Sequence, residues 1–125
     1  MLLLDTHTFL WFVNADKKLP KNTSDMIEED QSVFVSIASF WEITIKNSLG
    51  KLDLDIQVTD LMSSCADDGL TILPIKASHL EVLKTLPWIH RDPFDRLLIS
   101  QAISEDLTFV TVDENIKKYD LKTTW

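Results

Sequence analysis

A chain of 125 residues with 45% hydrophobic and 26% charged side chains has the composition of a soluble protein, and we expect residues 1–125 to form a single domain. Its net charge of −8 argues against nonspecific duplex binding through a broad basic surface. Cys65 is the only cysteine, which excludes an internal disulfide and a cysteine-based metal cage. The sequence has no signal-peptide pattern and no apolar run near the ~18 residues that span a bilayer, so a cytoplasmic location is expected.

The first half of the chain alternates between strand and helix patterns. Its predicted elements are strands at 1–4 and 32–35 and helices at 6–14, 23–30 and 37–49. Ser36 is the expected cap of the third helix, and Gly50 its expected end. The first helix carries large apolar groups such as Trp11 and Phe12 on more than one face, which predicts that it packs on something besides its own sheet.

The second half continues the alternation. Its predicted elements are a helix at 56–68, a strand at 70–74, helices at 78–86 and 93–103, a strand at 107–112 and an edge strand at 121–124. Asp92 followed by Pro93 is the pattern of an N-cap and a first helical position. Strands that alternate with helices predict a mainly parallel sheet with right-handed crossovers, in a three-layer α/β/α sandwich.

Two acids follow directly on predicted strands. Asp5 ends the first strand and Asp113 ends the fourth, and ligand sites in open α/β sheets lie at the carboxyl ends of strands. Each acid has a purely structural alternative. Asp5 is in position to cap helix 6–14, and Asp113 is in position to cap a helix at 114–119.

Two further acids lie on predicted helices, in rows that are otherwise apolar. Glu42 shares its row with Ala38, Ile45 and Leu49, and Asp95, in a first helical turn, shares its row with Leu98 and Ala102. A carboxylate that faces a core requires a cation or a hydrogen-bond donor. For Glu42 the alternatives are therefore a buried ion pair and a metal or catalytic acid.

Together the four acids come from parts of the chain that a parallel sheet brings to one edge. Hard oxygen ligands suit Mg²⁺ or Mn²⁺, and two such ions ~4 Å apart promote phosphodiester hydrolysis. The sequence has no Walker A loop, GxSxG elbow, HExxH pair or Rossmann glycine pattern, and its two glycines exclude a glycine-rich phosphate loop. The spacing of the three histidines does not favour a histidine-centred metal site.

Four segments, in this order, carry a resemblance to a known family. They are residues 2–8, residues 36–43 with Lys46, residues 90–96 and residues 110–113. Together they resemble PIN-domain proteins, in particular the toxin nucleases of VapBC-type toxin–antitoxin pairs, over essentially the full length. The resemblance implies a Mg²⁺- or Mn²⁺-dependent endoribonuclease with Asp5, Glu42, Asp95 and Asp113 as its acidic quartet.

Several other residues are expected to support such a site. By the resemblance, Thr111 corresponds to the family's hydroxyl residue two places before the last acid. Asp92 is either the helix cap or a further metal ligand. Lys46, Arg91 and Arg96 lie close to the acids in sequence and are expected either to hold phosphates or to be solvated.

The expected partners follow from the surface and from the resemblance. Single-stranded RNA is the expected substrate. The family resemblance implies a cognate antitoxin, which we expect to be basic and to use a groove near Trp11 and Trp41. The aromatic side chains Trp11, Phe12 and Trp41 predict a homodimer. The alternative function is a catalytically silent PIN-like or receiver-like module whose acidic pocket only binds a partner.

Overall fold

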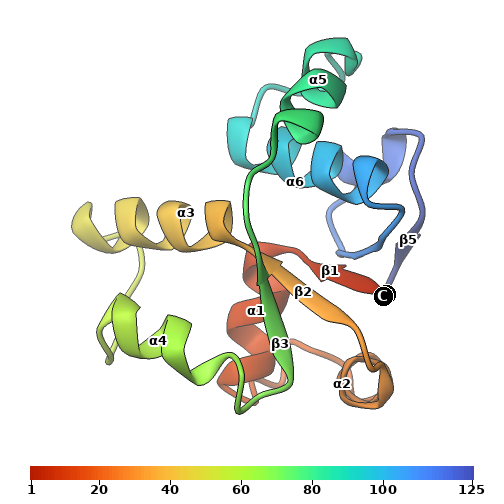
Figure 1. Cartoon of the computed structure of the whole chain (residues 1–125). Coiled ribbons are helices and arrows are strands. Elements are labelled where there is room, and N and C mark those ends of the chain that lie inside the picture. The colour runs from red at the N-terminus through yellow and green to blue at the C-terminus, as the bar shows by residue number, and fades with distance from the viewer.

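Five short strands pair in parallel into one sheet in the computed structural model, which describes residues 1–125 (Figure 1). The order across the sheet is β3-β2-β1-β4-β5, and every pairing is parallel. The strands are β1 (Leu2–Leu4), β2 (Val33–Ser36), β3 (Leu70–Leu73), β4 (Thr108–Val110) and β5 (Thr123–Thr124). The predicted parallel α/β/α sandwich is confirmed.

Helices cover both faces of this sheet. They are α1 (Thr6–Val13), α2 (Lys21–Glu29), α3 (Ile37–Ser48), α4 (Val58–Ser64), α5 (Ala77–Thr85), α6 (Pro93–Ser104) and the 3₁₀ helix η1 (Ile116–Lys118). In Figure 1, α5 and α6 lie on one side of the sheet, and α1, α2 and α4 on the other. None of the helices has the length and apolar character needed to cross a bilayer.

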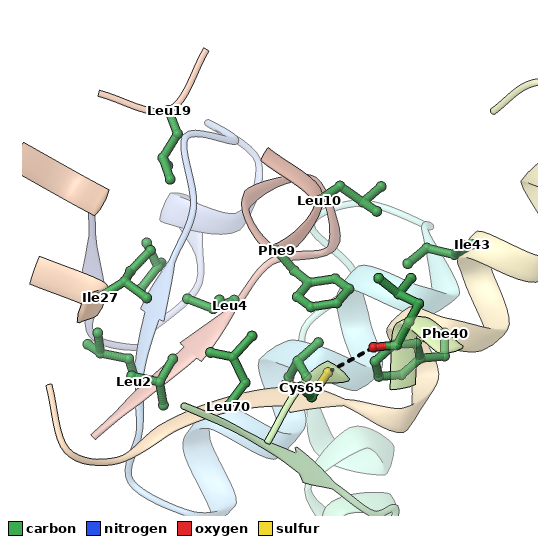
Figure 2. Packing of buried hydrophobic residues seen from close by; sticks show 14 residues of the cluster. Leu2, Leu4, Phe9, Leu10, Leu19, Ile27, Phe40, Ile43, Cys65 and Leu70 are labelled. Carbon is green, nitrogen blue, oxygen red and sulfur yellow. Dashed lines mark hydrogen bonds between the residues drawn. The ribbon is translucent and has the colours of Figure 1, made fainter. Parts of the chain in front are cut away.

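The central strand β1 separates two hydrophobic cores because successive side chains of a strand point to opposite faces. Leu2 and Leu4 belong to the core shared with α1, α2, α3 and α4, whereas Leu3 belongs to the core shared with α6. In the first core the rings of Phe9 and Phe40 pack edge to face with centroids 5.4 Å apart, and both are labelled in Figure 2. The two helix layers are therefore fixed to one strand, whose next residue is Asp5.

The helix starts agree with the sequence. Ser36 Oγ accepts a hydrogen bond from the N–H of Ala38 at 3.0 Å and caps α3. Asp92 Oδ1 accepts from the N–H groups of Phe94 and Asp95, at 2.9 and 3.1 Å, and caps α6. These caps stabilise the N-terminal ends of the two helices that carry Glu42 and Asp95.

Several element ends differ from the expectation. The helix predicted at 56–68 is shorter because the chain leaves α4 at Cys65 and turns back through Gly69, whose φ is +75°. The strand predicted at 107–112 is regular only over β4, since its neighbour β1 ends at Leu4, the partner of Val110. The helix predicted at 114–119 is a turn followed by η1.

The strand order contains a switch point beside β1. From β1 the chain builds outward through β2 to β3, and it then returns to add β4 on the opposite side of β1. At such a point the connections leave the carboxyl edge in opposite directions and open a crevice. Asp5 follows β1 at this crevice, and Thr111 and Asp113 follow β4.

Candidate active site

Asp5 has both of the roles that the sequence left open. It caps α1, and it lies among the acids at the carboxyl edge of the sheet. Its Oδ1 accepts the N–H of Thr6 at 2.8 Å, and its Oδ2 accepts the hydroxyl of Thr111 at 2.7 Å. The residue is 9% exposed, and burial raises the pKa of its carboxyl although both hydrogen bonds lower it. The nearby charge of Glu42 raises the pKa of Asp5 further.

Thr111 connects the ends of β1 and β4. Its fully buried hydroxyl donates to Asp5 and accepts the N–H of Asp113 at 3.0 Å. Asp113 in turn accepts the N–H of Asn115 on Oδ1 at 2.8 Å, which holds the turn that leads into η1. The hydroxyl at position 111 therefore sets the relative position of the two acids that follow the strands.

Glu42 is buried, with 4% exposure, and forms an ion pair with Lys46 one turn along α3, where Nζ and Oε2 are 2.7 Å apart. Burial alone would lower the pKa of Lys46. The hydrogen bond and charge of Glu42, together with the charges of Asp92 and Asp95, raise the pKa of Lys46 above its usual value. The ammonium of Lys46 thus lies in the field of acids from both α3 and α6.

The pKa of the Asp95 carboxyl is strongly raised. Burial raises the pKa of its carboxyl, a hydrogen bond with His90 lowers it, and the charges of Asp92, Asp5 and Asp113 raise it, with a net value of about 7. Oδ2 of Asp95 lies 3.1 Å from Nε2 of His90. The structure therefore brings the four sequence-predicted acids into one electrostatic environment, because each is coupled to at least one other.

The spacing of the acids is wider than a metal site requires. No three of the acidic, histidine or cysteine side chains stand close enough together to hold a metal ion. Each acid is turned toward its own protein partner, namely Thr111 for Asp5, Lys46 for Glu42, His90 for Asp95 and Asn115 for Asp113. The donor set itself suits a hard divalent cation, since buried carboxylates with raised pKa values lack sufficient positive charge nearby.

The contact between His90 and Tyr119 is a part of the site that the sequence did not reveal. The Tyr119 oxygen accepts the N–H of His90 at 3.3 Å and a guanidinium N–H of Arg96 at 3.1 Å. Its own hydrogen is then left to donate to Nδ1 of His90, 2.8 Å away. This network assigns the ring proton of His90 to Nε2, which donates to Asp95. Residues 29 positions apart share no helical or strand period, so no pattern could have linked them.

Arg96 was expected either to hold a phosphate or to be solvated, and the structure shows neither. It is 3% exposed, and its guanidinium donates to the carbonyl oxygens of Pro87 and Leu86 and to Tyr119. It also lies over the ring of Trp88, 3.8 Å from the centroid. Its donors are directed into the protein, so Arg96 supports the loop that carries His90.

An all-parallel sheet with acids gathered at its switch point defines an α/β domain with an acidic site at the carboxyl edge of the sheet. A family model described as PIN domain matches residues 2–122, and the chain belongs to this family. Membership supports a nuclease role in general. No curated protein matches the chain.

Solved structures share the fold over almost the entire chain. VapBC2 from Rickettsia felis, bound to a DNA fragment from its promoter, is 18% identical with a TM-score of 0.74, and the match covers 98% of this chain and 96% of that one. FitAcB from Neisseria gonorrhoeae is 16% identical with a TM-score of 0.65, covering 100% and 97%. DNA-bound VapBC from Salmonella typhimurium is 13% identical with a TM-score of 0.69, covering 98% and 96%. At these identities the likeness concerns the fold.

Proposed function

We propose that the protein is a metal-dependent endoribonuclease and the toxin of a type II toxin–antitoxin pair. Asp5, Glu42, Asp95 and Asp113 are the proposed ligands and catalytic acids. The observation that carries the proposal is the placement of Asp5 and Asp113 after β1 and β4, where their charges, from two other segments, act on the Asp95 carboxyl. Perturbed acids gathered in one cleft are typical of functional sites. Membership in the PIN domain family supports the same conclusion.

Mg²⁺ or Mn²⁺ is the proposed cofactor, held by oxygens of the quartet. When bound, such an ion supplies positive charge that activates a water and stabilises the charge that develops on a phosphodiester. Asp5, Glu42, Asp95 and Asp113 would hold the ion through carboxylate oxygens, with Asp95 in its ionised form. Lys46, which pairs with Glu42 in the metal-free protein, would then be available to contact a phosphate oxygen of the RNA.

The surrounding residues hold the acids in place for this chemistry. Thr111 fixes Asp5 relative to Asp113 through one hydroxyl. His90 donates to Asp95, and Tyr119 fixes the orientation of the His90 ring. Asp92 caps α6, and it also adds negative charge next to Asp95. Supporting hydrogen bonds of this kind determine where ligand oxygens point.

The proposed partner is a basic antitoxin segment. The similar VapBC and FitAcB structures support this pairing. A groove of about 380 Å³ next to α1 is lined in part by Trp11, Phe12, Leu19 and Pro20, and it offers the apolar surface expected for a partner helix. Trp41 lies elsewhere, against Phe94, with ring centroids 5.1 Å apart, so the two tryptophans line different surfaces.

Two assays test the proposed function. Purified protein is incubated with RNA and Mn²⁺, and the products are separated by size. Cleavage is expected with the wild type, and loss of cleavage is expected in EDTA and with Asp5→Ala or Glu42→Gln. Induction of the chain alone in a bacterial host is expected to arrest growth, and Asp95→Asn or co-expression of the neighbouring small gene is expected to relieve the arrest. No cleavage and normal growth together would favour the silent binding module.

A further inference from the structure

Trp88 presents an open aromatic face in the loop between α5 and α6, which also carries His90. Its side chain is 77% exposed, the largest exposure among the exposed large hydrophobic residues. The guanidinium of Arg96 covers one face of the ring, 3.8 Å from the centroid. The exposed area therefore belongs mainly to the opposite face and the ring edge. Tryptophan is usually largely buried, so a ring held in this way at the surface is available for a ligand.

Hydrogen bonds to the neighbouring backbone hold the loop that carries Trp88. Arg96, which is itself buried, donates to the oxygen of Pro87 at 2.8 Å and to that of Leu86 at 3.4 Å. The N–H of Ile89 donates to Pro87 O at 3.0 Å and tightens the turn. A ring that is already oriented loses little conformational freedom when a ligand stacks on it.

Cations surround this ring in an otherwise acidic protein. A cavity of about 300 Å³ is lined by Leu83, Lys84, Trp88, Arg91, Pro93 and Arg96. None of the ion pairs in the structure involves Lys84 or Arg91, so both charges are available. A flat apolar face with free cations at its rim matches a base with flanking phosphates.

A cation–π contact followed by three hydrogen bonds connects the Trp88 ring to Asp95. Arg96, which lies under the ring, donates to Tyr119; Tyr119 donates to His90; and His90 donates to Asp95. Asp95 and Arg96 are also consecutive residues of α6. The Trp88 ring and the Asp95 carboxylate therefore belong to one connected set of residues.

We propose that Trp88 is a stacking platform for one nucleobase of single-stranded RNA, with Lys84 and Arg91 contacting the phosphates beside that base. This inference rests on the proposed ribonuclease function and adds a binding site to it. Stacking is tolerant of base identity, because every base has a π-face. The platform would thus determine which phosphodiester of the RNA lies at the acids. Recognition of the RNA sequence would depend on other contacts.

The test measures binding separately from cleavage. A fluorescently labelled single-stranded RNA oligonucleotide is titrated with protein in EDTA at low salt, and Kd is obtained from anisotropy for the wild type, Trp88→Ala, Trp88→Phe and Trp88→Leu. Trp88→Leu keeps an apolar cover over Arg96 but removes the aromatic face. Leu49→Ala, at an exposed position on another helix end, is the matched control. Thermal melting verifies that each variant is folded.

We expect Trp88→Ala and Trp88→Leu to raise Kd by about 5- to 100-fold, and Trp88→Phe to raise it by much less. The control variant is expected to bind as the wild type does. An oligonucleotide that lacks the base at the platform should bind the wild type more weakly than the intact strand does. Trp88→Ala should bind the two oligonucleotides equally. Unchanged Kd in Trp88→Ala, or no binding by the wild type, overturns the platform. Normal binding without any cleavage in Mn²⁺ overturns the proposed ribonuclease instead.

Discussion

The hydroxyl of Thr111 donates to Oδ2 of Asp5 across 2.7 Å and joins residues that are 106 positions apart in the chain. The same oxygen accepts the N–H of Asp113, so one buried side chain serves two acids. Valine has nearly the shape of threonine but no hydroxyl. Substitution of Thr111 by valine therefore removes the two hydrogen bonds while it keeps the packing of the side chain.

Thr111→Val is expected to lower the free energy of unfolding by about 1–3 kcal/mol, because it leaves Asp5 and the N–H of Asp113 without their partner in a buried site. The pKa of Asp5 should rise further, since the hydrogen bond from Thr111 lowers it. Urea unfolding measures the first effect. Thr111→Ser keeps the hydroxyl and is the control, and equal stability of wild type and Thr111→Val would contradict the assigned hydrogen bonds.

Metal-free protein is expected to lose stability as the pH rises from about 4 to 7. Burial and neighbouring charges raise the pKa of Asp95 from 3.8 to about 7, so over this range the folded state binds more protons than the unfolded state. The free energy of unfolding then falls with pH. The change should be on the order of 2 kcal/mol, since each pKa unit corresponds to about 1.4 kcal/mol and solvent screens part of it.

Urea unfolding in EDTA at several pH values measures this slope. Asp95→Asn should flatten the slope, whereas Asp67→Asn, at an exposed position in the turn after α4, should leave it as in the wild type. A wild type that becomes more stable toward neutral pH would show that the Asp95 carboxyl is not the dominant titrating group.

Divalent metal should reverse this pH trend. Millimolar Mn²⁺ is expected to raise the melting temperature of the wild type, and a concentration ~100 times Kd would add about 2.7 kcal/mol. The rise should be larger near pH 7.5 than near pH 5, because the acids must lose their protons before they bind a cation. Asp95→Asn should respond little. An equal rise in wild type and variant would place the metal elsewhere.

Tyr119→Phe removes the hydroxyl that orients the His90 ring. We expect metal affinity or cleavage activity to fall by about 10- to 100-fold, the range found when a supporting partner of a ligand is lost. The variant also removes the acceptor that Arg96 shares with the backbone N–H of His90, although Arg96 keeps its bonds to Pro87 and Leu86, so a loss of stability is expected as well. Ile116→Val, in the same core as Tyr119, is the control, since it costs about 0.5–1.5 kcal/mol without touching the network. Equal metal affinity of both variants would contradict a positioning role.

Self-association is expected from Trp41, which is 58% exposed although it packs against Phe94. A symmetric dimer is the common arrangement for a soluble protein with such a surface. Light scattering across micromolar concentrations should show a dimer, and Trp41→Ser should shift it toward the monomer. A wild type that remains monomeric at tens of micromolar would contradict this expectation.

The sequence predicted those features that depend on local chemistry. The Asp92-Pro93 pair located the start of α6, Ser36 located the start of α3, and the acids after β1 and β4 lie at the carboxyl edge as expected. These predictions succeeded because caps and strand ends involve neighbouring residues.

Features that depend on distant contacts could not be predicted in the same way. The burial of Arg96 follows from carbonyl oxygens 9 and 10 positions away and from Tyr119, and no periodic pattern records such contacts. The contact between His90 and Tyr119 is of the same kind. The sequence indicated Gly69 as the residue after the helix, and Gly69 does adopt a left-handed conformation. The helix α4 itself already ends at Ser64, and the turn between Ser64 and Gly69 was not predicted.

The parallel pairing of β1 with β4 also has a consequence for synthesis on the ribosome. Asp5 is translated 106 residues before Thr111, which takes about 5 to 20 s at typical elongation rates. Until β4 emerges, the carboxylate of Asp5 lacks the hydroxyl that fixes it, and the crevice beside β1 lacks one wall. A pairing so distant in sequence forms late in folding. A nascent chain that lacks β4 is therefore incapable of assembling the acidic quartet, and the proposed nuclease activity requires the segment that carries Thr111 and Asp113.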